Sequence, residues 1–313
     1  MSNKSYTPLR INTLKADISI PFSLFILFKD QYIEYTLADS VIEKSKFKKL
    51  RRQKIAKFFI QDSDEEKYQN FVDHLLNTIL NKKDSLTEDK VNIIEGQAGN
   101  ALSSMAIDVG NEKSYDATRK AAKNIQKLII EDPKALQEMY SGNSSEEDPI
   151  IKHCLNVAAL SIRLAKEMKL SELETDYLST AALMHDVGLV QKSEQELFKR
   201  NKADLDKGQL KKYNLHCTDI IEILQDKSYI NKDILELIYN HEENLTGTGP
   251  LRKTKLTLAQ SILSLVNTYD KKISVDQQSP KEAIKTMMID ELGKYDLKHI
   301  QALQKVVKSQ LNF

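Results

Sequence analysis

Apolar residues recur every third or fourth position from residue 149 almost to the end of the chain, without a sustained alternation of apolar and polar residues. This spacing aligns the apolar side chains along one face of an α-helix. Polar stretches that favour loops interrupt the pattern near residues 169–171, 201–208, 244–253 and 274–280. We therefore expect the second half of the chain to be all-α, with its helices packed as a bundle.

The N-terminal part of the chain has a different pattern. Residues 22–28 and 31–37 are rich in aromatic and β-branched residues and favour a pair of strands. The spacing predicts a helix over residues 41–52, a further strand over 54–60, and an amphipathic helix that begins near Asp64. The predicted fold class is therefore α+β, with a small N-terminal α/β module followed by an all-α helical bundle.

Two domains are expected in a chain of 313 residues, because domains typically contain about 100–200 residues. The pattern from Leu86 to Met139 is helical with few breakers, and the stretch from Ser141 to Pro149 is the clearest loop. We assign residues 1–114 to an N-terminal α/β domain with a helical linker and residues 115–313 to the second domain.

The charge of the chain is nearly balanced, with 46 basic and 45 acidic side chains and a formal net charge of +1. Such a balance produces no global field that would attract nucleic acid or anionic lipid. The lysines and arginines of residues 44–54 lie on the polar side of a predicted helix, and no aromatic residues alternate with them. We interpret this segment as a solvated helix face rather than a nucleic-acid site.

The most apolar stretch, Ile18 to Phe28, is far shorter than the roughly 20 residues that a membrane-spanning helix needs. The N-terminus lacks the features of a signal peptide, and two cysteines are too few for a disulfide framework. We therefore expect a cytoplasmic protein with neither a membrane nor a nucleic-acid polymer as its partner. Cys154 and Cys217 each directly follow a histidine. Packing on the buried side of a helix is the favoured interpretation, and a redox or metal-ligand role is the alternative.

Four of the six histidines occur at intervals through the helical half of the chain, together with two aspartates. Each lies on the apolar face or at the end of a predicted helix, where metal sites in helical proteins are built. Imidazole and carboxylate together suit borderline divalent ions such as iron, manganese or zinc. A lone histidine on an apolar face is usually a packed core residue, but the whole set favours a metal site. The set consists of His153, His185, Asp186, His216, His241 and Asp270.

These residues and their neighbours resemble the HD-GYP branch of the HD metallohydrolase superfamily. His185-Asp186-Val187-Gly188 matches the HD doublet and its glycine, and His216 heads an apolar helix as in that branch. The stretch from His241 to Pro250 is similar to the extended signature HHExxDGxGYP, and Val266 to Asp270 is similar to a DxYD-type segment. The resemblance covers roughly residues 130–313.

The resemblance implies a cyclic di-GMP phosphodiesterase with two divalent metal ions, iron first, with manganese or zinc as alternatives. A phosphodiester is an anion and resists attack by hydroxide. Two metal ions stabilise the negative charge and supply a bridging hydroxide as the nucleophile. By resemblance, Asp186 bridges the ions and acts in catalysis with His185. The implied ligands are His153, His185 and Asp270 for one ion and His216 and His241 for the other, with Glu242 as a further candidate. The candidate substrate-binding residues are Gly247, Thr248, Gly249, Pro250 and Arg252.

Several positions depart from the pattern of the branch. No tyrosine stands between Gly249 and Pro250, and Glu242 occupies the place of the second histidine of the signature. Leu189 stands where a lysine usually follows the HD doublet, and Pro149 replaces a glutamate one turn before the first histidine. We therefore expect an unconventional member with two metals rather than three and with weak activity.

A regulatory module with degenerate catalysis is the alternative function; it would bind a cyclic dinucleotide or a partner protein of GGDEF type. A nucleotide monophosphatase or another HD phosphohydrolase is a third. The glycine-bearing loop Gly247–Pro250 argues against the third function, because simpler HD enzymes lack this loop. The N-terminal module resembles the variable sensory or partner-binding domains that precede HD-GYP units.

Overall fold

The computed structural model describes residues 5–53, 55, 57–82, 85–141, 148–190 and 195–311. The described residues up to Asn100 form one compact unit, and those from Ala101 onwards form a second. The boundary between the units falls inside helix α3 (Thr87–Ile107). The roles assigned above to residues 1–114 and 115–313 stay predictions.

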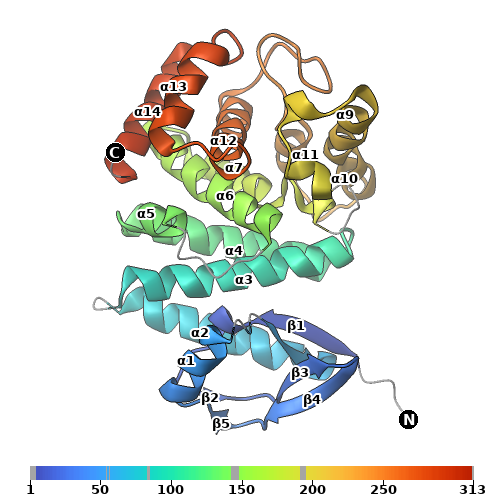
Figure 1. Ribbon diagram of the computed structural model, residues 1–313, viewed down its shortest axis with the longest axis vertical. Coiled ribbons are helices and arrows are strands. Elements are labelled where there is room, and N and C mark those ends of the chain that lie inside the picture. Colours follow the sequence, from blue (N-terminus) through green and yellow to red (C-terminus); the bar gives the residue numbers. More distant parts are fainter. Residues whose placement is uncertain are drawn as a thin grey trace. The chain divides into compact units, whose positions relative to one another are not determined.

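The first unit combines two small antiparallel sheets with helices α1 and α2 and the first part of α3. Four strands pair in the order β1-β6-β3-β4, and β2 pairs with β5. Phe28 lies opposite Gln31 across the tight turn of the β3–β4 hairpin (Figure 1), which confirms the predicted strand pair. The elements are β1 (Tyr6–Arg10), β2 (Ser19–Ile20), β3 (Leu24–Phe28), β4 (Gln31–Thr36), β5 (Ser40–Val41), β6 (Lys57–Gln61), α1 (Lys44–Arg52) and α2 (Glu65–Asn81).

Strand β1 was not expected from the sequence pattern, because its five residues do not alternate and include Pro8. Proline cannot donate a ladder hydrogen bond and is tolerated on edge strands, and β1 is an edge of the four-stranded sheet. The core of this unit forms where apolar side chains of α2 meet Phe22. The Phe22 ring packs edge-on against Tyr68, with 5.7 Å between ring centroids, and the Tyr68 hydroxyl donates to Thr13 at 3.1 Å.

The described residues of the second unit beyond α3 form helices joined by turns and loops, which confirms the predicted fold class. Helices α6 and α7 lie side by side, and α12 packs against α6 (Figure 1). The loop predicted at Ser141–Pro149 lies largely outside the described residues. The helices are α4 (Glu112–Glu131), α5 (Ala135–Tyr140), α6 (Pro149–Glu167), α7 (Glu172–Met184), α8 (Gln195–Phe198), α9 (Lys207–Asn214), α10 (His216–Leu224), α11 (Lys232–Tyr239), α12 (Leu258–Ser274), α13 (Pro280–Asp290) and α14 (Leu297–Gln310).

Side-chain caps fix where the central helices begin. The Asp148 carboxylate accepts from the first free N–H groups of α6, and Pro149 occupies its first turn, where the missing N–H of proline has no cost. Ser171 and Thr257 each start a capping box, at α7 and α12 respectively. Helices of this bundle therefore start at defined residues, which sets the phase of the side chains they direct inward. Every helix in the described part of the chain is too short or too polar to cross a lipid bilayer.

Candidate metal centre

The His185-Asp186 doublet lies immediately after the last residue of α7, Met184. The backbone leaves helical geometry at Asp186, where φ is −107° and ψ is 11°, and a 3-10 turn follows over Val187–Leu189. Both side chains of the doublet are fully buried. This break in the helix allows two adjacent residues to face the same point.

Three of the four histidines are oriented by the backbone of their own segment, because Nδ1 contacts the carbonyl oxygen three residues earlier. The pairs are His185 with Ala182 at 2.7 Å, His241 with Ile238 at 2.6 Å, and His216 with Tyr213. A carbonyl oxygen only accepts, so Nδ1 carries the proton and donates it. The lone pair is then on Nε2, which is the form of imidazole that binds a metal ion.

His216, at the start of α10, and His241, in the turn after α11, face each other. Their Nε2 atoms are 2.9 Å apart, and both side chains are buried. Because both Nδ1 atoms donate to carbonyls, two Nε2 lone pairs point at one another. That arrangement is repulsive unless a proton or a metal ion lies between the rings.

His153, on the buried face of α6, repeats this pattern beside the doublet. Its Nδ1 donates to the carboxylate of Asp270, on α12, at 2.6 Å, which leaves the Nε2 lone pair facing inward. That Nε2 lies 3.2 Å from Nε2 of His185 and 2.9 Å from Oδ1 of Asn267. These two nitrogens and the amide oxygen are all hydrogen-bond acceptors, and among the described residues no hydrogen-bond donor lies between them.

Asp186 stands between the two pairs of histidines. Its Oδ1 lies 3.1 Å from Nε2 of His216 and 3.3 Å from Nε2 of His241. Its Oδ2 lies 3.4 Å from Nε2 of His185 and 3.6 Å from Nε2 of His153. Each oxygen of one carboxylate therefore faces one pair, which is the arrangement of a carboxylate that could bridge two ions.

Both oxygens of Asp186 are buried and have no hydrogen-bond partner among the described residues. Burial alone would raise the pKa of this carboxyl, but Lys271 and His185 lower it well below its usual range, so the group is charged. A buried anion without donors costs free energy that a bound cation would offset. The side chains present therefore fit a pair of divalent metal ions. Their metal-binding atoms form two groups: His153, His185 and Asp186 in one, and His216, Cys217 and His241 in the other.

Asp270 and Glu242, both considered as ligands above, contact other partners here. Asp270 holds the Nδ1 side of His153, opposite the nitrogen that faces the doublet. Glu242 lies 3.9 Å from Nε2 of His241 but is bound more closely by Lys202, Lys271 and the Tyr213 hydroxyl. Direct coordination by either carboxylate stays a prediction.

The ammonium group of Lys271 lies close to the Asp186 carboxylate, which stands between the two pairs of histidines. Its ammonium nitrogen lies 2.8 Å from Glu242 Oε1, 3.7 Å from Asp186 Oδ2 and 2.5 Å from the Tyr213 hydroxyl. Burial alone would lower its pKa, but Asp186 and Glu242 raise that pKa well above its usual range. Lys271 therefore stays an ammonium group at the edge of the metal centre.

A cavity of about 460 Å³ opens beside this network and is lined by Glu242, Lys271, Thr248, Gly249 and Pro250 among others. Five cationic side chains, from Arg200, Lys202, Lys271, Lys272 and Lys294, line it against three acidic ones, from Glu242, Asp276 and Glu291. Of the candidate substrate-binding residues, Gly247 and Arg252 are not among its lining residues. The cavity shares Glu242 and Lys271 with the network beside Asp186 and carries an excess of positive charge.

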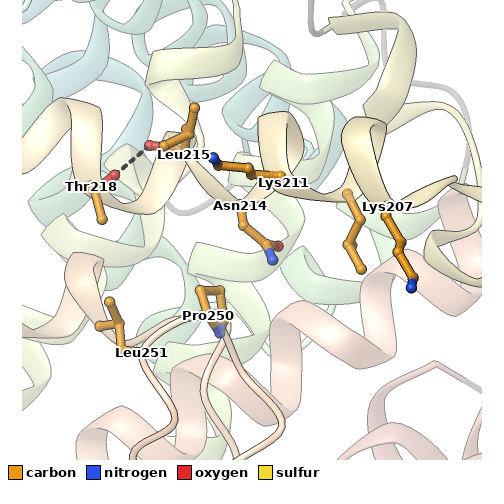
Figure 2. A pocket seen from close by; sticks show the side chains of 8 residues that line it. Lys207, Lys211, Asn214, Leu215, Thr218, Pro250 and Leu251 are labelled. Atoms are coloured by element: carbon orange, nitrogen blue, oxygen red, sulfur yellow. Dashed lines mark hydrogen bonds between the residues drawn. The ribbon is translucent and has the colours of Figure 1, made fainter.

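A second hollow of about 380 Å³ adjoins the first, because Leu210, Asn214 and Pro250 line both. Figure 2 shows Pro250 and Leu251 on their loop, facing the side chains of α9 and the start of α10. Lys207 and Lys211 add two further cations along this side. Together the two spaces form a basic surface that runs from Lys271 past Pro250.

The loop that carries Gly247, Gly249 and Pro250 is held by buried polar side chains. Glu243 accepts from the backbone N–H groups of Leu251 at 2.6 Å and Lys253 at 2.7 Å. A Cβ atom at Gly249 would lie 2.5 Å from Glu243 Oε1, so only glycine fits there. Gly247 has φ +68°, a conformation that glycine adopts without strain.

Three residues of the site were not singled out by sequence reasoning: Lys202, Tyr213 and Lys271. A lysine or tyrosine near the end of a helix is usually solvated, so composition gives no signal for these positions. The adjacency of Lys271 to Asp270 is the signal that could have identified it.

Cys217, for which packing was favoured, places Sγ 3.5 Å from Nε2 of His216. Burial alone would raise the pKa of this thiol, but His216 and His241 lower it to about 6.

Comparison with known proteins decides the family. The family model described as HD domain matches residues 125–298, more than half of the chain. The chain belongs to the HD domain family. Among solved structures, it is similar to Bd1817, an HDG"Y"P protein from Bdellovibrio bacteriovorus, with 26% sequence identity and a TM-score of 0.80. That match covers 97% of this chain and 100% of Bd1817. No curated protein matches the chain.

These matches support the HD-GYP assignment within the HD superfamily, as the sequence motifs predicted. The similarity to Bd1817 extends over nearly the whole chain, so it includes the N-terminal unit as well as the HD domain. Together with the two groups of metal-binding side chains, one of His and Asp and one of His and Cys, the matches support a metal-dependent HD hydrolase.

Proposed function

We propose that this HD protein is a phosphodiesterase that hydrolyses cyclic di-GMP or a related cyclic dinucleotide. The observation that carries the proposal is the position of Asp186, which turns one buried oxygen toward each of two histidine pairs. Two-ion centres suit phosphodiesters because the substrate is an anion that resists attack by an anionic nucleophile.

His153 and His185 would hold one ion and His216 and His241 the other, with Asp186 shared between them. When bound, the ions would stabilise negative charge on the phosphoryl group and lower the pKa of a water molecule. Iron is the ion we propose first, with manganese or zinc as alternatives, because imidazole-rich sites with carboxylate accept all three. Asp270 would keep the ring of His153 oriented through its contact with Nδ1.

The cavity beside the centre supports a polyanionic substrate. Lys271, whose ammonium lies 3.7 Å from Asp186 Oδ2, lines it together with Lys202 and Arg200. These cations would attract and orient the phosphates of a cyclic dinucleotide. Thr248, Gly249 and Pro250 would shape the side of the cavity that receives the rest of the substrate.

The test is turnover of cyclic di-GMP by protein reconstituted separately with iron under anaerobic conditions, manganese and zinc. We expect slow hydrolysis that depends on the ion, because absence of one preorganised contact typically costs about 10²–10³ in rate. The branch's lysine and tyrosine are both missing here. Fully metallated protein that hydrolyses no cyclic dinucleotide would contradict the proposal.

A binding protein without turnover is the second candidate. Its support is that cavity cations are already paired, Lys271 and Lys202 with Glu242 and Lys272 with Glu291. Leu189, at the position of the branch's lysine, is fully buried. Calorimetric titration would distinguish the two candidates. Binding of cyclic di-GMP without formation of product would favour a regulatory protein, which would act through the N-terminal unit or a GGDEF-type partner.

A further inference from the structure

The sulfur of Cys217 lies within the group of atoms that would surround the second ion. Cys217 is the second residue of α10 and is 1% exposed. Its Sγ lies 3.5 Å from Nε2 of His216 and 4.0 Å from Nε2 of His241. The three donor atoms lie within 4.8 Å of one another.

A separate observation identifies this point as a cation position. Oδ1 of Asp186 is fully buried, has no hydrogen-bond partner among the described residues, and lies 3.1 Å and 3.3 Å from the same two Nε2 atoms. The carboxylate oxygen, two imidazole lone pairs and the sulfur therefore converge on one small volume. A side chain that packed only for its apolar surface would not need to face three acceptors.

Cys154 provides the internal comparison. It also directly follows a histidine and is also fully buried, but its sulfur accepts from the backbone N–H of Asp186. In the described part of the chain, this sulfur lies within hydrogen-bonding distance of no imidazole nitrogen. Both cysteines therefore lie beside residues of the centre. Among the described residues, the sulfur of Cys217 faces the two Nε2 atoms, whereas that of Cys154 faces a backbone N–H.

We propose that Cys217 is a protein ligand of the ion held by His216 and His241. That position would then offer one thiolate, two imidazoles and one oxygen of Asp186. The other position offers two imidazoles and a carboxylate oxygen. Thiolate selects softer ions than carboxylate does, so the two positions should differ in metal preference, with the Cys217 position favouring zinc or ferrous iron over manganese. This inference rests on the proposed metal centre but not on cyclic di-GMP as substrate.

Binding would be coupled to loss of the thiol proton, which passes to the solvent as the Sγ–metal bond forms. Cobalt(II) reports this bond directly, because thiolate coordination produces an intense charge-transfer absorption in the near ultraviolet. Metal-free full-length protein would be titrated with cobalt(II) while absorbance and bound cobalt are measured. No turnover is needed for this readout.

Three proteins are compared: the natural chain, Cys154→Ser and Cys217→Ser. Since the chain has two cysteines, Cys217 supplies the only thiolate in Cys154→Ser. We expect the band in the natural chain and in Cys154→Ser, and its loss in Cys217→Ser. In Cys217→Ser, affinity for the second equivalent of cobalt should fall by about 100-fold or more, given that even outer-shell changes cost 10–100-fold.

The result in Cys154→Ser keeps the test decisive even if Cys217→Ser does not fold. Two bound equivalents of cobalt without a thiolate band in that variant would overturn the proposal. So would a band that persists in folded Cys217→Ser, or a chain that binds no cobalt at all. A clear band in a protein that leaves cyclic di-GMP intact would uphold the ligand assignment while contradicting the proposed activity.

Discussion

Asp186 touches both halves of the centre, so its replacement should affect both ions together. Asp186→Asn keeps the shape of the side chain but removes its charge and turns one oxygen into a donor facing imidazole nitrogens. We expect affinity for both ions to fall by about 100-fold or more, measured by elemental analysis after dialysis. Asp226→Asn, at an exposed acid, is the control. Full retention of one ion in Asp186→Asn would contradict the bridging position.

Lys271 and Glu242 should contribute to stability as a coupled pair even without metal. Lys271→Met and Glu242→Gln each leave a partly buried charged neighbour with fewer partners, and each should lower the free energy of unfolding by about 1–3 kcal/mol. Urea unfolding in chelator would measure the single and double variants, with exposed Lys285→Met as control. The double variant should lose less than the sum of the singles; additivity within about 0.5 kcal/mol would show that the pair is not coupled.

At this scale, sequence reasoning found the ligand candidates but not the groups around them. The order of His153, His185, Asp186, His216 and His241 is a property of the chain, so it could be read from the sequence. Which nitrogen of His153 faces inward depends on the contact of α6 with Asp270 of α12, and the direction of the Lys271 ammonium depends on Asp186 and Glu242, which are distant in sequence. Leu189 illustrates the limit: its sequence position suggests a missing cation, but its side chain lies in the core.

Among the elements, the loop after α11 should be the least tolerant of added volume. A methyl group at Gly249 would meet Glu243 Oε1 and the carbonyl oxygen of Glu242 at 2.5 Å and 2.7 Å. Gly249→Ala should therefore destabilise the protein by about 1–3 kcal/mol and weaken binding of cyclic di-GMP. Thermal unfolding and calorimetry would measure both effects.

Gly110→Ala is the matched control for this loop. There, a new Cβ would meet the far end of the flexible Lys227 side chain at 3.3 Å, so we expect a change within about 0.5 kcal/mol and unchanged binding. Equal effects at the two glycines would show that the Gly249 contact is not a constraint.

Helix bounds were predicted best where the apolar spacing is local and continuous. Helix α10 (His216–Leu224) begins at His216, as the sequence predicted, and α6 begins at Pro149 after its Asp148 cap. Helix α11 ends at Tyr239, so His241 lies in the turn beyond the helix and not within it. Helix ends depend on which carbonyl groups find other donors, and that is decided by neighbours distant in sequence.

At the scale of the whole molecule, metal should stabilise the two units unequally. The candidate ligands all lie in the unit that begins at Ala101. An ion at 100 times its dissociation constant adds about 2.7 kcal/mol to stability, which corresponds to about 100-fold slower hydrogen exchange for amides that exchange by unfolding of this unit.

Hydrogen-exchange mass spectrometry in the presence of metal or chelator would measure this difference. Peptides from α6, α7 and α10 should slow on metal addition, while those from β3, β4 and β6 should keep their rates. Uniform slowing across both units would mean that they unfold together, and no slowing anywhere would contradict the metal centre.

The Nδ1 contacts imply that mutations elsewhere in the chain disturb the orientation of some histidine rings more easily than that of others. His185, His216 and His241 are oriented by main-chain carbonyls, which no single side-chain replacement removes. His153 is oriented by the carboxylate of Asp270, 117 positions away in the chain, so one codon change at Asp270 could release it. Among descendants of this sequence, the half of the centre built on His153 should therefore be the first to decay, while the half built on His216 and His241 persists.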